Sequence, residues 1–120
     1  MKRGRRISIA TIGAIALLAF AAQPAAAEDA PDAAKLWTKH CQSCHGPDGK
    51  GKTKAGEKAN VRDLTLPDVK ASLTLAKATE AIKNGVKDKD DPAKFVMKSY
   101  AEKLSAAEID ALAAHSIAFK

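Results

Sequence analysis

The chain has 120 residues, with 28% charged and only 4% aromatic side chains, and its formal net charge is +6 at neutral pH. This length allows one small domain with a thin hydrophobic core. The basic residues do not form a stripe interleaved with aromatic residues, so the composition excludes a typical nucleic-acid-binding surface, and we expect no nucleic-acid partner.

The first 27 residues have the features of a secretory signal peptide. Four basic residues lie within positions 2–6, an uncharged and mostly apolar run covers 7–22, and Ala25-Ala26-Ala27 forms a cleavage signal before Glu28. The alternative is an uncleaved anchor, but the run of 16 residues is shorter than the roughly 20 that a spanning helix needs. We expect export to the periplasm, cleavage after Ala27 and a mature domain of residues 28–120. Cleavage lowers the net charge to +2, because all four removed charges are basic.

The mature chain begins with an amphipathic segment. Pro31 suits the first turn of a helix. Apolar positions then recur at three- and four-residue spacing through Leu36 and Trp37 to Cys41. This spacing predicts a helix whose buried face carries Trp37 and leads directly into a cysteine motif. His40 lies on the same turn and is expected at the surface or at the edge of the site.

The sequence Cys41-Gln42-Ser43-Cys44-His45 is typical of a c-type haem attachment site. On one helical turn the two thiols point the same way and can add to the two vinyl groups of one haem, and His45 can then supply the proximal ligand. A thioredoxin-like dithiol would need a βαβ unit, which the pattern lacks. A zinc site would crowd His40, both cysteines and His45 into six residues, which is poor tetrahedral geometry.

Residues 46–66 are predicted to form a loop followed by an extended piece. Glycines and Pro47 exclude regular structure over 46–51. Four lysines follow within 50–58, and they form either a solvated loop or a positive collar that steers an acidic redox partner. Val61, Leu64 and Leu66 are expected to contribute to the core.

Pro67 and Asp68 are expected to start a short turn or helix. A longer helix is predicted from Thr74, as its N-cap, to Asn84, with Gly85 ending it. Residues 86–100 are predicted to be a polar loop. This loop carries Met97, the single methionine of the mature chain. A thioether suits haem iron, so Met97 is the candidate sixth ligand, with an ordinary core methionine as the alternative.

The last predicted helix has a capping box, with Ser105 as N-cap and Glu108 three residues later. Its apolar face, from Ile109 to Ile117, is expected to cross the helix that bears Trp37. His115 near its end is a second, weaker candidate for the distal ligand.

With these motifs in view, the chain from about Asp32 to Lys120 resembles the class I cytochrome c family. The resemblance rests on Cys41–His45, on Met97 followed by Tyr100, and on the Lys103-Leu104-Ser105 start of the last helix. It implies an all-α fold of three to four helices around one covalent haem c, with crossing terminal helices and with His45 and Met97 as axial ligands. Lys98 stands where many members have proline, and no proline-containing acceptor for the second nitrogen of His45 is evident.

The sequence therefore predicts a periplasmic one-electron carrier that is not an enzyme, acts as a monomer, remains out of the membrane after cleavage and exchanges electrons with partner proteins. Cys41, Cys44, His45 and Met97 are its expected site residues. Two alternatives stay open. A haem protein with a free sixth position would act as a gas sensor or a peroxidase-like enzyme, and a haem-free protein would use its two thiols in redox exchange.

Overall fold

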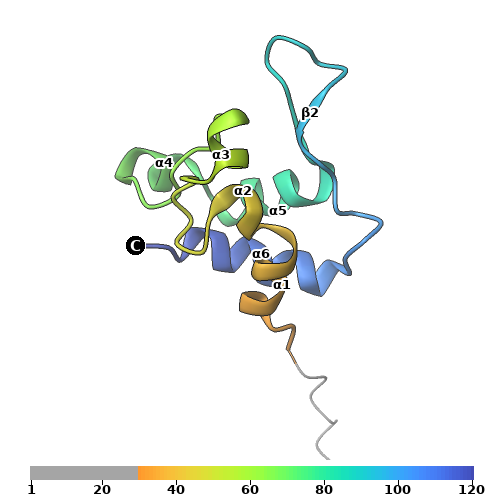
Figure 1. Cartoon of the computed structure of the whole chain (residues 1–120). Helices are drawn as coiled ribbons and strands as arrows, with labels where there is room; N and C mark the ends of the chain where they lie inside the picture. Colours follow the sequence, from red (N-terminus) through yellow and green to blue (C-terminus); the bar gives the residue numbers. More distant parts are fainter. Residues whose placement is uncertain (1–29) are drawn as a thin grey trace, which may run out of the picture.

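The computed structural model describes residues 30–120, which fold into a helical body with one projecting hairpin (Figure 1). The signal peptide predicted for residues 1–27 lies outside the described residues. Within 30–120 the elements are α1 Ala33–His40, α2 Gln42–His45, α3 Lys54–Lys58, α4 Pro67–Ser72, α5 Leu75–Asn84, β1 Val86–Lys87, β2 Phe95–Met97 and α6 Ala106–Ile117. The all-α fold class is confirmed, with more helices than the three to four expected because residues 42–72 contain three short ones.

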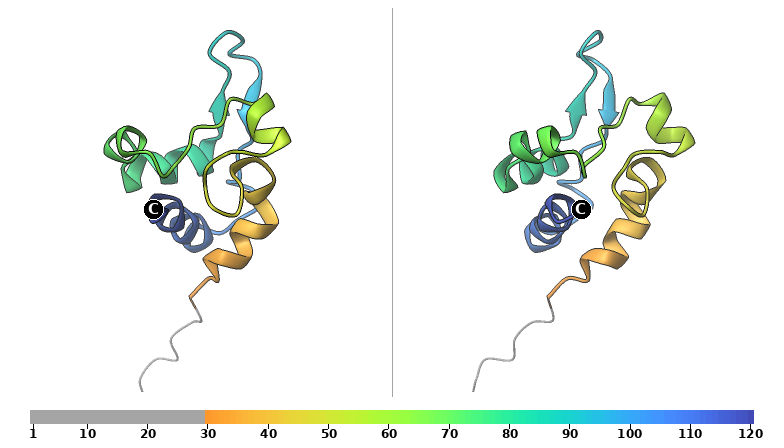
Figure 2. Two further views of the ribbon diagram at one scale, coloured as in Figure 1. Left: turned by 60° about the vertical axis from the view of Figure 1, so that its left-hand side comes forward. Right: turned by 90° about the vertical axis from the view of Figure 1, so that its left-hand side faces the viewer.

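The terminal helices α1 and α6 cross, as the sequence predicts (Figures 1 and 2). At the crossing, the indole ring of Trp37 is buried and its centroid lies 5.4 Å from that of His115 and 4.8 Å from that of Phe119. Helix α5 packs on α6 as well. The core formed in this way contains Trp37, Cys41, Leu64, Ala78, Ile82, Leu104, Ile109, Leu112 and Ala113.

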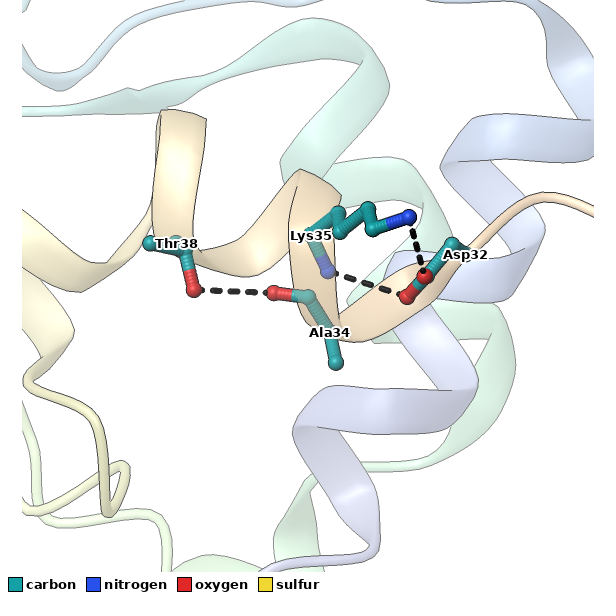
Figure 3. Close-up of polar contacts among 4 residues, drawn as sticks. All are labelled: Asp32, Ala34, Lys35 and Thr38. Carbon is teal, nitrogen blue, oxygen red and sulfur yellow. Dashed lines mark hydrogen bonds and ion pairs between the residues drawn. The ribbon is translucent and has the colours of Figure 1, made fainter.

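Side-chain caps fix the ends of the main helices. Ser105 and Glu108 make both hydrogen bonds of the predicted capping box, and Thr74 caps α5. Helix α1 begins one residue after Asp32, whose carboxylate accepts from the Lys35 N–H and also pairs with the Lys35 ammonium at 3.4 Å (Figure 3). Pro31 therefore precedes the helix instead of starting it.

The segment predicted to be a loop over 86–100 contains an antiparallel hairpin, which corrects that expectation. Strand β1 pairs with β2 through Val86↔Met97 and Lys87↔Phe95, with an irregularity between the two pairs. The hairpin projects away from the α1–α6 crossing (Figures 1 and 2). Strands of two and three residues are too short to show the alternation by which strands are recognised.

Leu64 is buried as predicted, whereas Leu66 is 50% exposed and is not a core residue. Leu66 immediately precedes α4 and occupies its N-cap position, with an extended backbone. None of the helices within residues 30–120 has the length and apolar character needed to cross a membrane.

Candidate functional site

The cysteine motif lies where α1 ends and α2 begins. The backbone turns at Cys41, and the N–H groups of Cys44 and His45 both donate to the Cys41 carbonyl, at 3.2 and 2.9 Å. Cys41 is buried, Cys44 is half-buried, and both thiols are free. Burial, with a smaller contribution from Cys44, raises the pKa of Cys41 to about 11. The motif thus presents both thiols on a single tight turn.

His45 is the residue of the motif that has a buried polar atom without a hydrogen-bond partner in the part of the chain that the structure describes. Its Nδ1 is buried and makes no hydrogen bond within residues 30–120. Burial lowers the pKa of His45, which favours the neutral imidazole that binds metals. A buried nitrogen without a partner costs free energy, so the residue is suited to a bound group that uses the imidazole.

Several contacts hold the motif in this position. The buried indole of Trp37 donates from Nε1 to the Gly46 carbonyl at 2.9 Å, and its ring centroid lies 5.5 Å from that of His45. Thr53 Oγ1 lies 2.8 Å from the Ser43 carbonyl and 3.0 Å from the Cys44 carbonyl. Trp37 was predicted to be a core residue, but the hydroxyl contacts of Thr53 have no signature in the sequence.

A cavity of about 200 Å³ opens beside the motif, and its lining is mainly apolar. Cys41 and His45 contribute to it from one part of the chain, and Met97 contributes from β2. Asn60 and Arg62 are polar residues of the lining that the sequence analysis did not single out. The fold therefore brings Cys41, His45 and Met97 to one space, although more than fifty residues separate Met97 from the motif in sequence; Cys44 is not among the residues that line this cavity.

The remaining lining residues are mostly small or aliphatic: Ala59, Val61, Leu64, Leu73, Ala78, Ala81, Ile82, Val86 and Val96. Such a wall suits a flat apolar macrocycle held by two thioethers. The free thiols, the unpartnered buried imidazole and the apolar wall together fit a covalently attached haem. Arg62 adds a cationic group at the cavity, where it could pair with a carboxylate.

The two other histidines do not line this cavity. His40 is half-buried, as expected for an edge position, and its ring packs edge-on against Tyr100. The ring of His115 packs against those of Trp37 and Phe119, which also pack against each other, where α1 meets α6. The part of the chain from residue 30 onward contains no group of three or more His, Cys, Asp or Glu side chains placed to hold a metal, so the geometry does not support the zinc alternative.

The fold and the motif define a small c-type cytochrome, and comparison with known proteins agrees. The family model for cytochrome c oxidase, cbb3-type, subunit III, matches residues 28–115, and the chain belongs to this family. The solved structure of KustC0563 c-type cytochrome is 31% identical, with a TM-score of 0.65, over 75% of this chain and 99% of that one. A mutant of Kustc0563 gives a TM-score of 0.63 at the same identity. No curated protein matches the sequence significantly.

Membership of a c-type cytochrome family implies a covalently bound haem c and a role in electron transfer. It also accords with export, which is typical of such proteins. The thioredoxin-like alternative fails on the fold, because the sheet within residues 30–120 is a two-stranded antiparallel hairpin without a βαβ unit.

Proposed function

We propose that this chain is a periplasmic electron carrier with one haem c, attached through Cys41 and Cys44 and ligated by His45 and Met97. The observation that carries the proposal is the shared cavity, which is lined by Cys41 and His45 from the motif and by Met97 from the hairpin. The family match begins at residue 28, immediately after the cleavage site expected from the sequence. This start supports export and removal of residues 1–27.

When bound, the haem supplies a one-electron ferric/ferrous couple. The protein's residues hold it in place and limit rearrangement. Trp37 fixes the turn that carries His45, through the hydrogen bond of its indole to the Gly46 carbonyl. The aliphatic wall excludes water, and Met97 offers a neutral sulfur that raises the reduction potential relative to a histidine ligand. Ligation by the same two residues in both oxidation states would keep reorganisation small.

The lysine-bearing segment lies next in sequence to residues that line the cavity. Lys50, Lys52, Lys54 and Lys58 are all exposed, and the segment leads directly into Asn60–Arg62, which line the cavity. Positive charge near the point of electron exchange speeds encounter with an acidic partner. We therefore propose that redox partner proteins, acting as donor and acceptor, approach this side of a monomeric carrier.

A second candidate is a haem protein with an open sixth position, such as a gas sensor. This candidate is favoured by the short, exposed hairpin strand that carries Met97. Strand β2 has three residues, it pairs only with the two-residue β1, and its Phe95 and Val96 are exposed. A short exposed hairpin can move away from the cavity more easily than a packed helix can.

Carbon monoxide distinguishes the two candidates. The full-length chain is expressed with a haem-maturation system, and absorption spectra of the oxidised and reduced protein are recorded with and without the gas. The carrier predicts a c-type reduced spectrum that does not respond to carbon monoxide. A reduced spectrum that shifts readily would show that Met97 is not holding the iron, and the sensor would replace the carrier.

A further inference from the structure

The segment that follows Met97 is fastened to the C-terminal end of α5. The Ser99 hydroxyl donates to the Lys83 carbonyl at 2.6 Å, and the Tyr100 N–H donates to the Ile82 carbonyl at 3.0 Å. Gly85 permits this approach, because a Cβ there would lie 2.6 Å from the Met97 carbonyl oxygen. Residues 97–100 therefore cannot shift without breaking contacts to α5.

Tyr100 also connects this segment to the haem-attachment end of α1. Its hydroxyl donates to the His40 carbonyl at 2.9 Å, across sixty positions of sequence. The ring centroids of Tyr100 and His40 lie 5.7 Å apart in an edge-on arrangement. The contact is made at the residue immediately before the first cysteine of the motif.

The His40 carbonyl is open to this contact because the helix ends there. In a continuous helix the Cys44 N–H would donate to the His40 carbonyl, but it donates to the Cys41 carbonyl instead, at 3.2 Å. Among residues 30–120, the group that donates a hydrogen bond to the His40 carbonyl is the Tyr100 hydroxyl. Burial, with smaller contributions from Cys41 and Cys44, raises the pKa of Tyr100, so its hydroxyl remains protonated and able to donate.

We infer that Tyr100 is a positioning residue that locks the Met97-bearing segment against the Cys41 end of α1. This inference rests on the proposed ligation by Met97. The attachment motif and β2 both line the cavity, and the Tyr100 hydroxyl joins the segment just after β2 to the residue just before the motif. Loss of the hydroxyl leaves the ring and the α5 contacts in place, but it favours states in which Met97 has moved away.

The test is Tyr100→Phe in the haem-loaded protein, with imidazole as a probe that competes with Met97 for ferric iron. Because one hydrogen bond contributes modestly to a local equilibrium, we expect the apparent affinity for imidazole to rise roughly 2- to 10-fold. The matched control is Thr38→Val. It also removes one hydroxyl that donates to a carbonyl of α1, from Thr38 Oγ1 to Ala34 at 3.0 Å (Figure 3), but Thr38 is exposed and is not among the residues that line the cavity with Met97. We expect imidazole affinity in this control to equal that of the wild type.

The outcomes separate this inference from the proposed function. If the wild-type protein and Tyr100→Phe resist imidazole equally, the positioning role of Tyr100 is overturned. Ligation by Met97 is not contradicted by this result. An equal rise in Thr38→Val also overturns it, since general loosening of α1 would explain the effect. Wild-type protein that already binds imidazole and carbon monoxide freely contradicts Met97 ligation, and both proposals then fail. The covalent haem content of each variant verifies that it has folded and matured.

Discussion

Replacing Gly56 by alanine tests whether α3 supports the cysteine motif. Gly56 is buried, and a Cβ at this position would lie 2.3 Å from the Cys44 carbonyl oxygen and 2.3 Å from the Gly51 carbonyl oxygen. Both contacts are with backbone atoms, which cannot rotate away as the end of a side chain can. The substitution must therefore move either α3 or the turn that carries Cys44 and His45.

Two effects of Gly56→Ala oppose each other, and their magnitudes decide the outcome. Alanine is favoured over glycine within a helix by about 1 kcal/mol. Overpacking of a tight site costs about 1–3 kcal/mol, and two backbone contacts at 2.3 Å place this case near the upper end, at about 3 kcal/mol. The expected net result is a loss of about 2 kcal/mol in the free energy of unfolding.

Thermal unfolding of the haem-loaded protein, followed by circular dichroism, measures this loss. A domain of this size shifts its Tm by about 4–8 °C per kcal/mol, so we expect a decrease of roughly 8–16 °C. Ala55→Gly, at the exposed neighbouring position of α3, is the control. It removes helix propensity without a steric effect and should lower the Tm by about 4–8 °C. A Tm for Gly56→Ala at or above the wild-type value would refute the close packing of α3 on the motif.

Three further predictions concern the haem and its partners. Met97→Ala should let the reduced protein bind carbon monoxide and should lower the reduction potential; a spectrum and potential equal to those of the wild type would exclude Met97 as a ligand. The double change Cys41→Ala with Cys44→Ala should abolish covalent haem, which intact mass after denaturation measures, and a retained haem mass would contradict the attachment site. Association with an acidic redox partner should slow as salt rises from 0.01 to 0.15 M, because the Debye length falls from about 30 to about 8 Å. Replacing Lys50 and Lys52 by glutamine should reduce this salt dependence. An association rate that does not change with salt would contradict steering and would mean that the lysines only form a solvated loop.

Local chemistry explains why much of the fold follows from the sequence. The capping box of Ser105 and Glu108 uses residues three positions apart, and both of its hydrogen bonds are present. Trp37 lies on the apolar face of a short periodic segment, and it is buried against α6 as expected. The end of α5 at Gly85 follows from a backbone with φ of +77°, which glycine adopts without steric cost.

The features that the sequence did not predict depend on contacts between distant residues. The β1–β2 pairing joins strands too short to have a recognisable period. The Tyr100–His40 hydrogen bond depends on the way α1 ends at Cys41, which no local pattern reveals. Leu66 was predicted to be buried from its apolar character, but it stands at the N-cap position of α4 and is 50% exposed.

The residues of the candidate site likewise follow from the sequence where they are close together in it and not where they are far apart. Cys41, Cys44 and His45 form a contiguous motif, so their proximity required only one helical turn. The presence of Met97 at the same cavity depends on where strand β2 lies in the fold, and the spacing of Met97 from the motif in the sequence does not reveal this. Arg62 was not predicted to be a site residue, because an arginine beside a lysine-rich loop forms no recognisable sequence motif. Its place in the cavity lining is seen only in the structure.

The most direct test of the carrier is a potentiometric titration of the haem-loaded protein monitored by its absorption spectrum. One haem with two permanent protein ligands predicts a single reversible one-electron wave, with the same curve in the oxidative and reductive directions. It also predicts the weak red band of methionine–iron ligation in the oxidised spectrum. Two waves, hysteresis between the directions, or an oxidised spectrum without that band would contradict a single haem held by His45 and Met97.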